Sequence, residues 1–318
     1  MIWLYILIFI ISSLALVRSG IWVVRSLTRV AQFLGWREFI VASILMAFST
    51  SLPELFIGIT SALHQRPQLS FGVVIGSNIV ALTLIIGIGT ILAKGLEFKG
   101  RILQRSSFYA GIYGLLPLLL MLDGKVSRTD GVILLLALAF YFFQLLSEEE
   151  RFTRIFSDNL KEGWLPFKIF LRDLVLFLGG TGLLLLSAEG IVFSASKLAV
   201  TFNLSLIVIG AVLIALGTSL PEIAFEIRAI QLGHKKMILG DVMGSVVVNS
   251  ALVLGLVALI SPFEILNFSP YLIGIIFTVA TCLFFVIFAR TDRKITKKEA
   301  IFLIEIYILF VLVEILAR

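Results

Sequence analysis

The chain has 318 residues, of which 59% are hydrophobic and only 14% are charged, and its mean hydropathy is +1.09. Soluble domains contain about half apolar and about a quarter charged residues, so this composition excludes a predominantly soluble protein. The net charge of +6 is explained below by membrane topology, and we expect no nucleic-acid partner. The single cysteine, Cys282, excludes an intramolecular disulfide and is expected to be a small core residue.

Apolar runs of about twenty residues, each long enough to cross a bilayer as a helix, recur along the whole chain. The first run begins at the N-terminus without a preceding basic stretch, so we expect a first span rather than a cleavable signal peptide. Residues 18–37 are a candidate continuation of this span as a long tilted helix. Ten spans are predicted, near residues 2–17, 38–63, 70–93, 106–122, 130–147, 168–196, 203–230, 237–261, 268–289 and 299–317.

The basic residues lie mainly on one side of these spans. Connections 1–2, 3–4, 5–6, 7–8 and 9–10 carry 21 of the 26 lysines and arginines, and the opposite side carries five. Because basic loops stay cytoplasmic, we expect a multi-pass protein of the cell (plasma or inner) membrane with both termini extracytoplasmic. The asymmetry also supports ten spans, because one missed span would scramble it.

The two halves of the chain are related by a constant offset of 168 residues. Residues 50–54, Thr-Ser-Leu-Pro-Glu, recur at 218–222, and Gly76-Ser77 recurs as Gly244-Ser245. Each half holds five spans, an odd number, so the second half is expected to be inverted in the membrane, which is a transporter architecture. We therefore predict an all-α polytopic membrane protein with ten transmembrane helices in two inverted five-helix repeats. The predicted parts are a first repeat at 1–147, a short central cytoplasmic loop at 148–167 and a second repeat at 168–318.

Each repeated motif places two hydroxyls, a proline and a carboxylate inside an apolar run. A carboxylate in that setting is costly unless it has a partner, so it indicates function. The proline lacks an N–H and is expected to break the helix and free backbone oxygens. Residues three and four apart share a helix face, so the hydroxyls flank the carboxylate in each copy. The expected side-chain ligands are Glu54, Glu222, Thr50, Thr218, Ser51, Ser219, Ser77, Ser245 and Asn249.

This ligand set consists only of oxygen atoms, which favours Ca²⁺ and Na⁺ over zinc or copper. The two glutamates carry a formal charge of −2, which one Ca²⁺ neutralises. Sodium ions and a calcium ion cannot occupy the same carboxylates together. Mutual exclusion at a shared site is the physical basis of antiport.

The motifs resemble those of the Na⁺/Ca²⁺ exchangers of the cation/Ca²⁺ antiporter superfamily. The two alpha repeats of that family carry G/S-T-S-L-P-E in one span and G-S-N-x-x-N or G-S-N-x-x-D in the next. Residues 49–54 and 217–222 match the first motif, and the resemblance covers essentially the whole chain. It implies transport of Ca²⁺ and Na⁺ by alternating access, with long spans 1 and 6 sliding across the site. It implies no enzymatic activity and no cofactor, and we infer no partner besides the ions and the lipid bilayer.

The resemblance also implies roles for individual residues. Glu54 and Glu222 would be the central Ca²⁺ ligands, and Thr50 and Thr218 would help them. Ser51 with Ser77, and Ser219 with Ser245, would serve flanking sodium sites, completed by the backbone carbonyls of Ala47 and Ala215. Asn249 matches the polar position of the second repeat.

Four residues depart from the family pattern. Ala81 stands where the family has Asn or Asp, and Val246 replaces the asparagine of G-S-N, which the first repeat keeps as Asn78. Glu226 and Asp241 are carboxylates at unusual places. We expect Glu226 and Asp241 near the membrane surface or in a local pair. If either lines the pathway, it would favour the alternative of a Ca²⁺/H⁺ (or other divalent cation/H⁺) antiporter. A third hypothesis, a membrane enzyme or channel, is disfavoured by the repeat and by the lack of a His/Cys nucleophile or metal cluster.

Four further acidic residues lie near predicted span ends, where we expect them to be solvated or to reach toward the membrane surface. They are Asp173, Glu189, Glu305 and Glu314.

Overall fold

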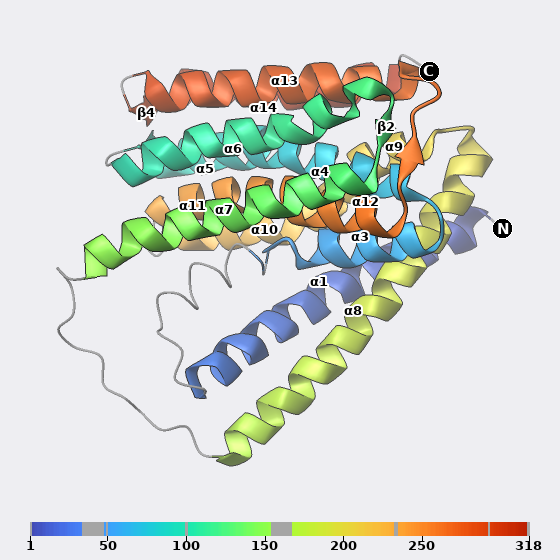
Figure 1. Cartoon of the computed structure of the whole chain (residues 1–318), viewed down its shortest axis with the longest axis horizontal. Helices are drawn as coiled ribbons and strands as arrows, with labels where there is room; N and C mark the ends of the chain where they lie inside the picture. Colours follow the sequence, from blue (N-terminus) through green and yellow to red (C-terminus); the bar gives the residue numbers. More distant parts are fainter. Residues whose placement is uncertain are drawn as a thin grey trace.

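A computed structural model describes residues 2–33, 48, 50–98, 101–153, 167–231, 235–291 and 293–316. Two long helices, α1 (Ile2–Phe33) and α8 (Phe167–Phe202), pack side by side and run obliquely to the other helices (Figure 1). With 32 and 36 residues they exceed the roughly 20 residues that a bilayer crossing needs, so they must tilt or project from it. The predicted continuation of the first span beyond residue 17 is therefore confirmed as far as Phe33.

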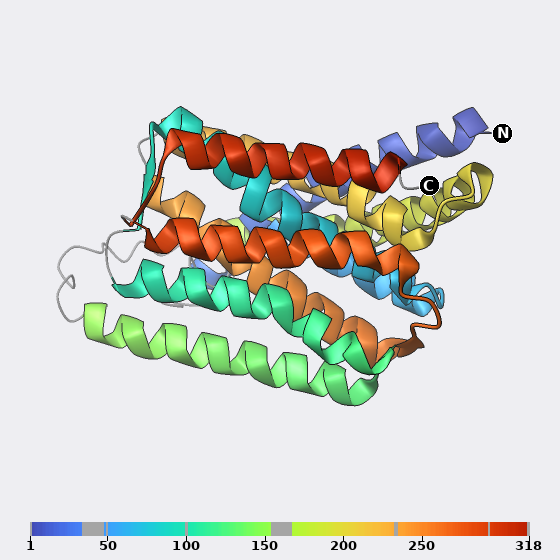
Figure 2. The same cartoon turned by 90° about the horizontal axis from the view of Figure 1, so that it is seen from above.

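The other helices form a bundle beside this pair (Figures 1 and 2). In the first half they are α3 (Leu52–Leu63), α4 (Pro67–Val80), the π-helix η1 (Ala81–Ile85), α5 (Ile86–Ala93), α6 (Arg101–Leu120), the 3₁₀-helix η2 (Met121–Asp123) and α7 (Arg128–Thr153). In the second half they are α9 (Leu206–Val208), the π-helix η3 (Ile209–Ile214), α10 (Ala215–Gln231), α11 (Lys235–Val248), the π-helix η4 (Asn249–Val253), α12 (Leu254–Ile260), α13 (Ser269–Arg290) and α14 (Lys297–Leu316). Helix α7 extends to Thr153, six residues beyond the predicted end of its span at 147.

The offset of 168 residues found in the sequence also relates these elements. Adding 168 to the bounds of α4 gives those of α11, and the same shift carries η1 onto η4 and the first residue of α6 onto that of α13. Figures 1 and 2 place the two chain ends at the same end of the bundle. An even number of crossings between the termini requires this placement.

Two short antiparallel sheets join the halves. The strand β1 (Leu96–Glu97) pairs with β4 (Lys294–Ile295), and β2 (Lys125–Val126) pairs with β3 (Phe263–Glu264). Each sheet takes one strand from each half of the chain, so the connecting loops of the two halves are hydrogen-bonded to each other.

The centre of the bundle is α4, whose helical residues are almost all buried and which packs against η3. Glycine makes this contact possible: a Cβ on Gly72 would lie 2.1 Å from the carbonyl oxygen of Ile207, and one on Gly76 equally close to that of Ala211. Small residues that let helix backbones approach closely are typical of packing inside membranes. The buried Cys282 belongs to the same core, as the sequence predicts.

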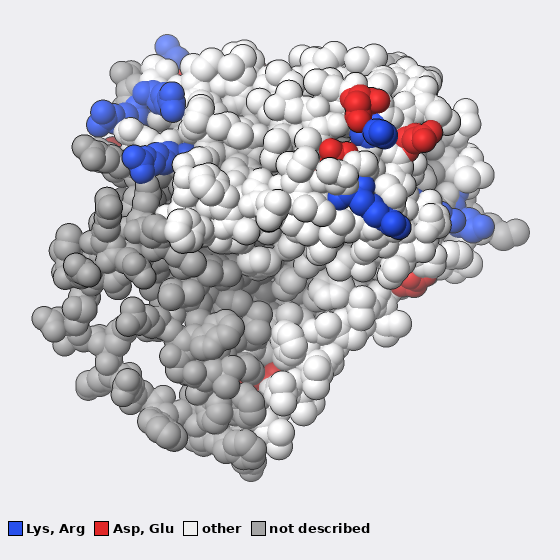
Figure 3. All heavy atoms as spheres, viewed as in Figure 1, with Lys and Arg blue, Asp and Glu red and all other residues white. Residues whose placement is uncertain are grey.

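The outer surface of the bundle is apolar. Large hydrophobic side chains such as Leu14, Leu136, Leu186 and Leu309 are exposed, although a soluble protein would bury them. Charged side chains gather toward the two ends of the face shown in Figure 3 and leave an uncharged band between them. Among the described residues, six helices are long and apolar enough to cross a membrane, and α3 and the segment 206–220 are shorter apolar helices. The protein is thus a helical membrane protein.

The four acidic residues expected to be solvated divide into two groups. Glu189 and Glu305 are exposed, as predicted, and Glu189 contacts His64 at 2.7 Å. Asp173 and Glu314 are buried, so the prediction is wrong for them. The Oδ1 atom of Asp173 lies 3.5 Å from Arg172 Nη2. The position of an acidic residue near the end of a predicted span therefore does not determine whether its side chain is exposed.

The close contact of α4 with η3 predicts that a methyl group added at the interface lowers the stability of the protein. Gly72→Ala would drive a Cβ into the Ile207 carbonyl, and forcing a group into a packed core costs about 1–3 kcal/mol. We expect a clearly lowered melting temperature of the detergent-purified protein, followed by tryptophan fluorescence. Gly179→Ala on α8 is the control, because nothing lies within 4 Å of its Cβ position. Equal melting temperatures for the two variants would contradict the close approach.

Candidate ion-binding site

The two motif glutamates lie in the interior, on helices from different halves of the chain. Glu54 is in the first turn of α3 and Glu222 is in α10, and their side chains are 0% and 5% exposed. Helices α3 and α10 are in contact, and the two carboxyl groups are close enough to repel each other. The structure therefore brings together the two residues that the sequence repeat relates.

Hydroxyl groups surround Glu54. Ser77 of α4 donates a hydrogen bond to Glu54 Oε1 at 3.1 Å, and the Thr218 hydroxyl from α10 lies beside the same carboxylate. Thr218 Oγ1 also donates to the carbonyl oxygen of Ala215 at 3.1 Å. Glu54 is thus contacted by side chains of both halves.

Thr50 links the first motif to α11 of the second half. Its hydroxyl lies 2.8 Å from Ser245 Oγ and 3.2 Å from Asp241 Oδ1, to which it donates a hydrogen bond. The sequence places Thr50 beside Glu54 on one helix face, but it does not predict this contact with Asp241. The carboxylate oxygens of Glu54 and the hydroxyl of Thr50 therefore contact different elements of the second half.

Several oxygen atoms at this place have no hydrogen-bond donor among the described residues, although they are buried. A buried oxygen without a partner is costly, and a cation supplies the missing interaction. In the described part of the chain no three acidic, histidine or cysteine side chains are arranged to hold a metal ion by themselves, so any cation here must also use hydroxyl, amide or carbonyl oxygens. The unpartnered atoms are Ser51 Oγ, Glu54 Oε2, Ser219 Oγ, Glu222 Oε1 and Asn249 Oδ1.

The helices are irregular near the site, but the prolines account for only one of the irregularities. The helical geometry is interrupted at Ser51, and α3 begins at Leu52 with Pro53 in its first turn. In the second copy α10 runs without a break through Pro221, so the predicted break at this proline is wrong. The irregular segment there is η3, which ends one residue before Ala215. Short π-helical turns within α-helices are frequent at functional sites.

Ala81 and Asn249 occupy equivalent positions, because they are the first residues of η1 and η4. The methyl group of Ala81 is buried and offers no ligand, which leaves the site asymmetric. Nearby, Asn78 Nδ2 donates to Ser250 Oγ at 2.8 Å, and Asn78 Oδ1 is buried without a donor. Asn78 is the asparagine of the G-S-N motif, so the motif could have identified it as a residue near the site. Nothing in the sequence singles out Ser250.

Glu226 and Asp241 are buried in the helix bundle, with 2% and 4% exposure. They interact with each other and with Glu222, as expected for a local pair. Of the other predicted ligands, Ala215 is described, and Ala47 lies outside the described residues.

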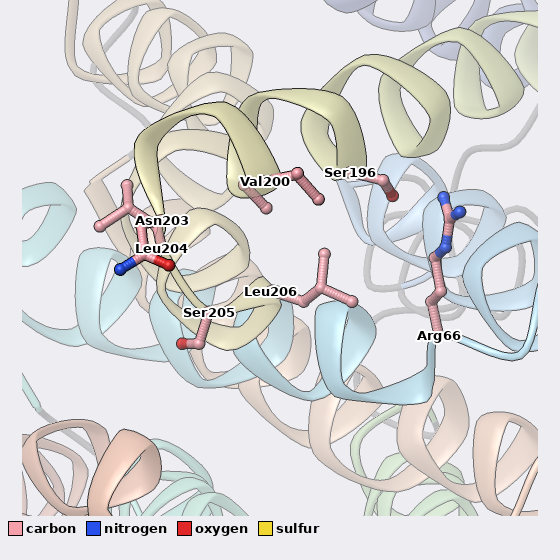
Figure 4. Close-up of a pocket in the computed structure, with 8 residues that line it drawn as sticks. Arg66, Ser196, Val200, Asn203, Leu204, Ser205 and Leu206 are labelled. Atoms are coloured by element: carbon pink, nitrogen blue, oxygen red, sulfur yellow. The ribbon is translucent and has the colours of Figure 1, made fainter.

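A surface pocket of about 590 Å³ lies elsewhere, at the end of α8 (Figure 4). Its lining includes Arg66, Ser196, Val200 and Leu206 and none of the predicted ligands. Arg66 and Ser196 point toward each other at one side of the pocket, and apolar side chains line the middle. We therefore base the site on the buried oxygen atoms and not on this pocket.

A family model described as sodium/calcium exchanger protein matches residues 4–146 and again residues 173–316. The chain belongs to this exchanger family. It is 27% identical to the sodium/calcium exchanger MaX1 of Methanosarcina acetivorans over an alignment of 348 positions, which covers 96% of this chain and 97% of that protein. It is 29% identical over 301 residues to the uncharacterized membrane protein MJ0091 of Methanocaldococcus jannaschii, covering 95% of each chain.

Solved structures agree with this assignment. The sodium-calcium exchanger NCX_Mj, soaked with Na⁺ and Sr²⁺, superimposes with a TM-score of 0.65 at 26% identity, over 97% of this chain and 98% of that one. The H⁺/Ca²⁺ exchanger CAX superimposes with a TM-score of 0.76 at 17% identity, over 98% of this chain and 86% of that one, and shows the shared fold alone. The resemblance read from the motifs is confirmed.

The double contact of Thr50 generates a stability prediction. Thr50→Val keeps the shape but removes the donor to the Asp241 carboxylate, and the loss of a hydrogen bond to a charged group costs about 1.5–3 kcal/mol. We expect a lower melting temperature in detergent. Thr90→Val on α5 is the matched control: its hydroxyl is buried and has no partner among the residues that the structure describes, so its removal should be neutral or stabilising. A Thr50→Val protein as stable as the control would rule out the bridge.

Proposed function

We propose that the protein is a secondary active antiporter that exchanges Ca²⁺ for Na⁺ by alternating access at one shared site. The observation that carries the proposal is the juxtaposition of Glu54 and Glu222, which are buried together without a basic partner among the described residues. Two uncompensated carboxylates inside a membrane protein are tolerated where they serve an ion pathway. Their combined charge of −2 suits one Ca²⁺ or two Na⁺.

The neighbouring oxygens fit the same ions. Hard cations such as Ca²⁺ take carboxylate, hydroxyl, amide and carbonyl oxygens. We assign Ca²⁺ to the two glutamates with help from Thr50 and Thr218, and Na⁺ to the flanking serines. Those serines are Ser51 with Ser77 and Ser219 with Ser245. Asn249 and the backbone carbonyls of Ala47 and Ala215 complete the proposed set.

For the whole chain we propose ten transmembrane helices in two inverted repeats, 1–147 and 168–318, joined by a cytoplasmic loop at 148–167. The constant offset between elements, the two matches of one family model and the location of both termini at one end of the bundle support this arrangement. We place the protein in the cell membrane with both termini extracytoplasmic. The pair α1–α8 would move against the bundle during exchange. We propose neither a cofactor nor an enzymatic activity.

A sodium gradient is expected to drive ⁴⁵Ca²⁺ uptake into proteoliposomes that contain the purified protein. Glu54→Gln or Glu222→Gln removes one of the two charges of the glutamate pair, and we expect uptake to fall by at least about a hundredfold, as for a lost buried charge next to a divalent ion. Glu305→Gln, which changes an exposed carboxylate of α14, is the control. Uptake that persists in both glutamine variants would refute the proposed site.

The second candidate function is Ca²⁺/H⁺ antiport, because Glu226 and Asp241 are buried beside Glu222. A carboxylate is sufficient to carry a proton. If protons are exchanged, a pH gradient without sodium will drive uptake as well as a sodium gradient does, and Asp241→Asn will remove the dependence on pH. Uptake that requires sodium at every pH would exclude this candidate.

A further inference from the structure

Glu226 and Asp241 are the feature of the interior that the exchange site leaves unexplained. Glu226 lies one helical turn after Glu222 in α10, and Asp241 lies one turn before Ser245 in α11. Four residues of α-helix advance about 6 Å, so both carboxylates are displaced from the central site in the same direction. That direction leads to the end of the bundle where α11 begins, next to β1.

Among the described residues, these two carboxylates have few of the partners that usually accompany buried charge. Both oxygens of Glu226 are buried and accept no hydrogen bond from an N–H or hydroxyl donor there, and neither residue forms an ion pair in the described part of the chain. Asp241 receives one hydrogen bond, from the Thr50 hydroxyl. Two adjacent buried carboxylates raise each other's energy, and a cation between them would relieve both the repulsion and the desolvation.

The other half of the chain has no such pair. Subtracting 168 from these positions gives Gly58 and Val73, which are both buried. A Cβ on Gly58 would already lie 2.8 Å from Val253 Cγ1, so no acidic side chain fits there. The acidic pair therefore exists on one side of the central site only, and the repeat does not explain it.

We propose that Glu226 and Asp241 form an auxiliary site for a divalent cation, one helical turn from the central site on the route to the β1–β4 end. The Thr50 hydroxyl, which contacts both Asp241 and Ser245, adjoins both sites. Glu222 and Glu226 lie four residues apart on α10 and share a helix face, so a calcium ion can pass from one site to the other without leaving negative charge. The proposal extends the exchange function proposed above, and it makes Ca²⁺ entry asymmetric.

Equilibrium binding of ⁴⁵Ca²⁺ to the purified full-length protein tests the auxiliary site without any transport. In the E54Q/E222Q variant the central site is lost, and we expect a weaker residual site. Adding Glu226→Gln should weaken that residual binding by roughly tenfold or more, because a charge in direct contact with the ion is removed. Adding Glu314→Gln, a buried carboxylate of α14, should leave it unchanged. Melting curves establish that every variant is folded, and Glu226→Asp should restore binding.

The absence of residual binding in E54Q/E222Q would overturn the proposal, as would binding that survives Glu226→Gln. The latter result would mean that the pair does not hold the cation. In membrane vesicles of the two opposite orientations, Glu226→Gln should raise the apparent KM for Ca²⁺ from the β1–β4 side alone, and an equal rise from both sides would also overturn it. A wild-type protein that binds Ca²⁺ at the auxiliary site but exchanges none would refute the proposed function and not this inference.

Discussion

The burial of negative charge, with no basic partner among the described residues, is the constraint on which the rest of this structure depends. Glu54 and Glu222 lie inside a bundle whose outer surface is apolar. The repulsion between them favours separation, and the packing of α3, α4 and α10 opposes it. Buried carboxylates of this kind are unfavourable by themselves, and a cation bound at the proposed site would relieve that cost.

The packing that resists this repulsion comes from very small side chains. Gly72 and Gly76 allow α4 to touch the carbonyls of η3, and no larger residue permits that distance. The two β-sheets then tie loops of one half to loops of the other. Close backbone contacts in the middle and hydrogen-bonded loops at the ends make the bundle a single rigid support for the buried oxygens.

The sequence predicted which residues lie close together where two signals exist: a motif that occurs in both halves, and a polar group placed in an apolar run at high energetic cost. Glu54, Glu222 and Ser77 come together as the motifs indicate, and the offset of 168 residues recurs in the helix bounds. The contact of Thr50 with Asp241, and that of Asn78 with Ser250, depend on how α11 and η4 lie against the first half. Such contacts are set by tertiary packing, which the local pattern of residues does not encode. The same limitation explains why Pro221 was expected to break α10, and why Asp173 and Glu314 were expected to be solvated.

The lengths of α1 and α8 have a mechanical consequence. A helix of 36 residues measures about 54 Å, whereas the hydrocarbon layer is about 30 Å thick. Exposed apolar side chains continue along α8 from Leu171 to Phe202, so the apolar surface of this helix is longer than the hydrocarbon layer is thick. Such a helix can shift along its own axis by a turn or more and still present hydrocarbon to lipid at every stage. The surplus length would therefore allow the sliding proposed above at little cost in solvation, and neither β-sheet takes a strand from this pair.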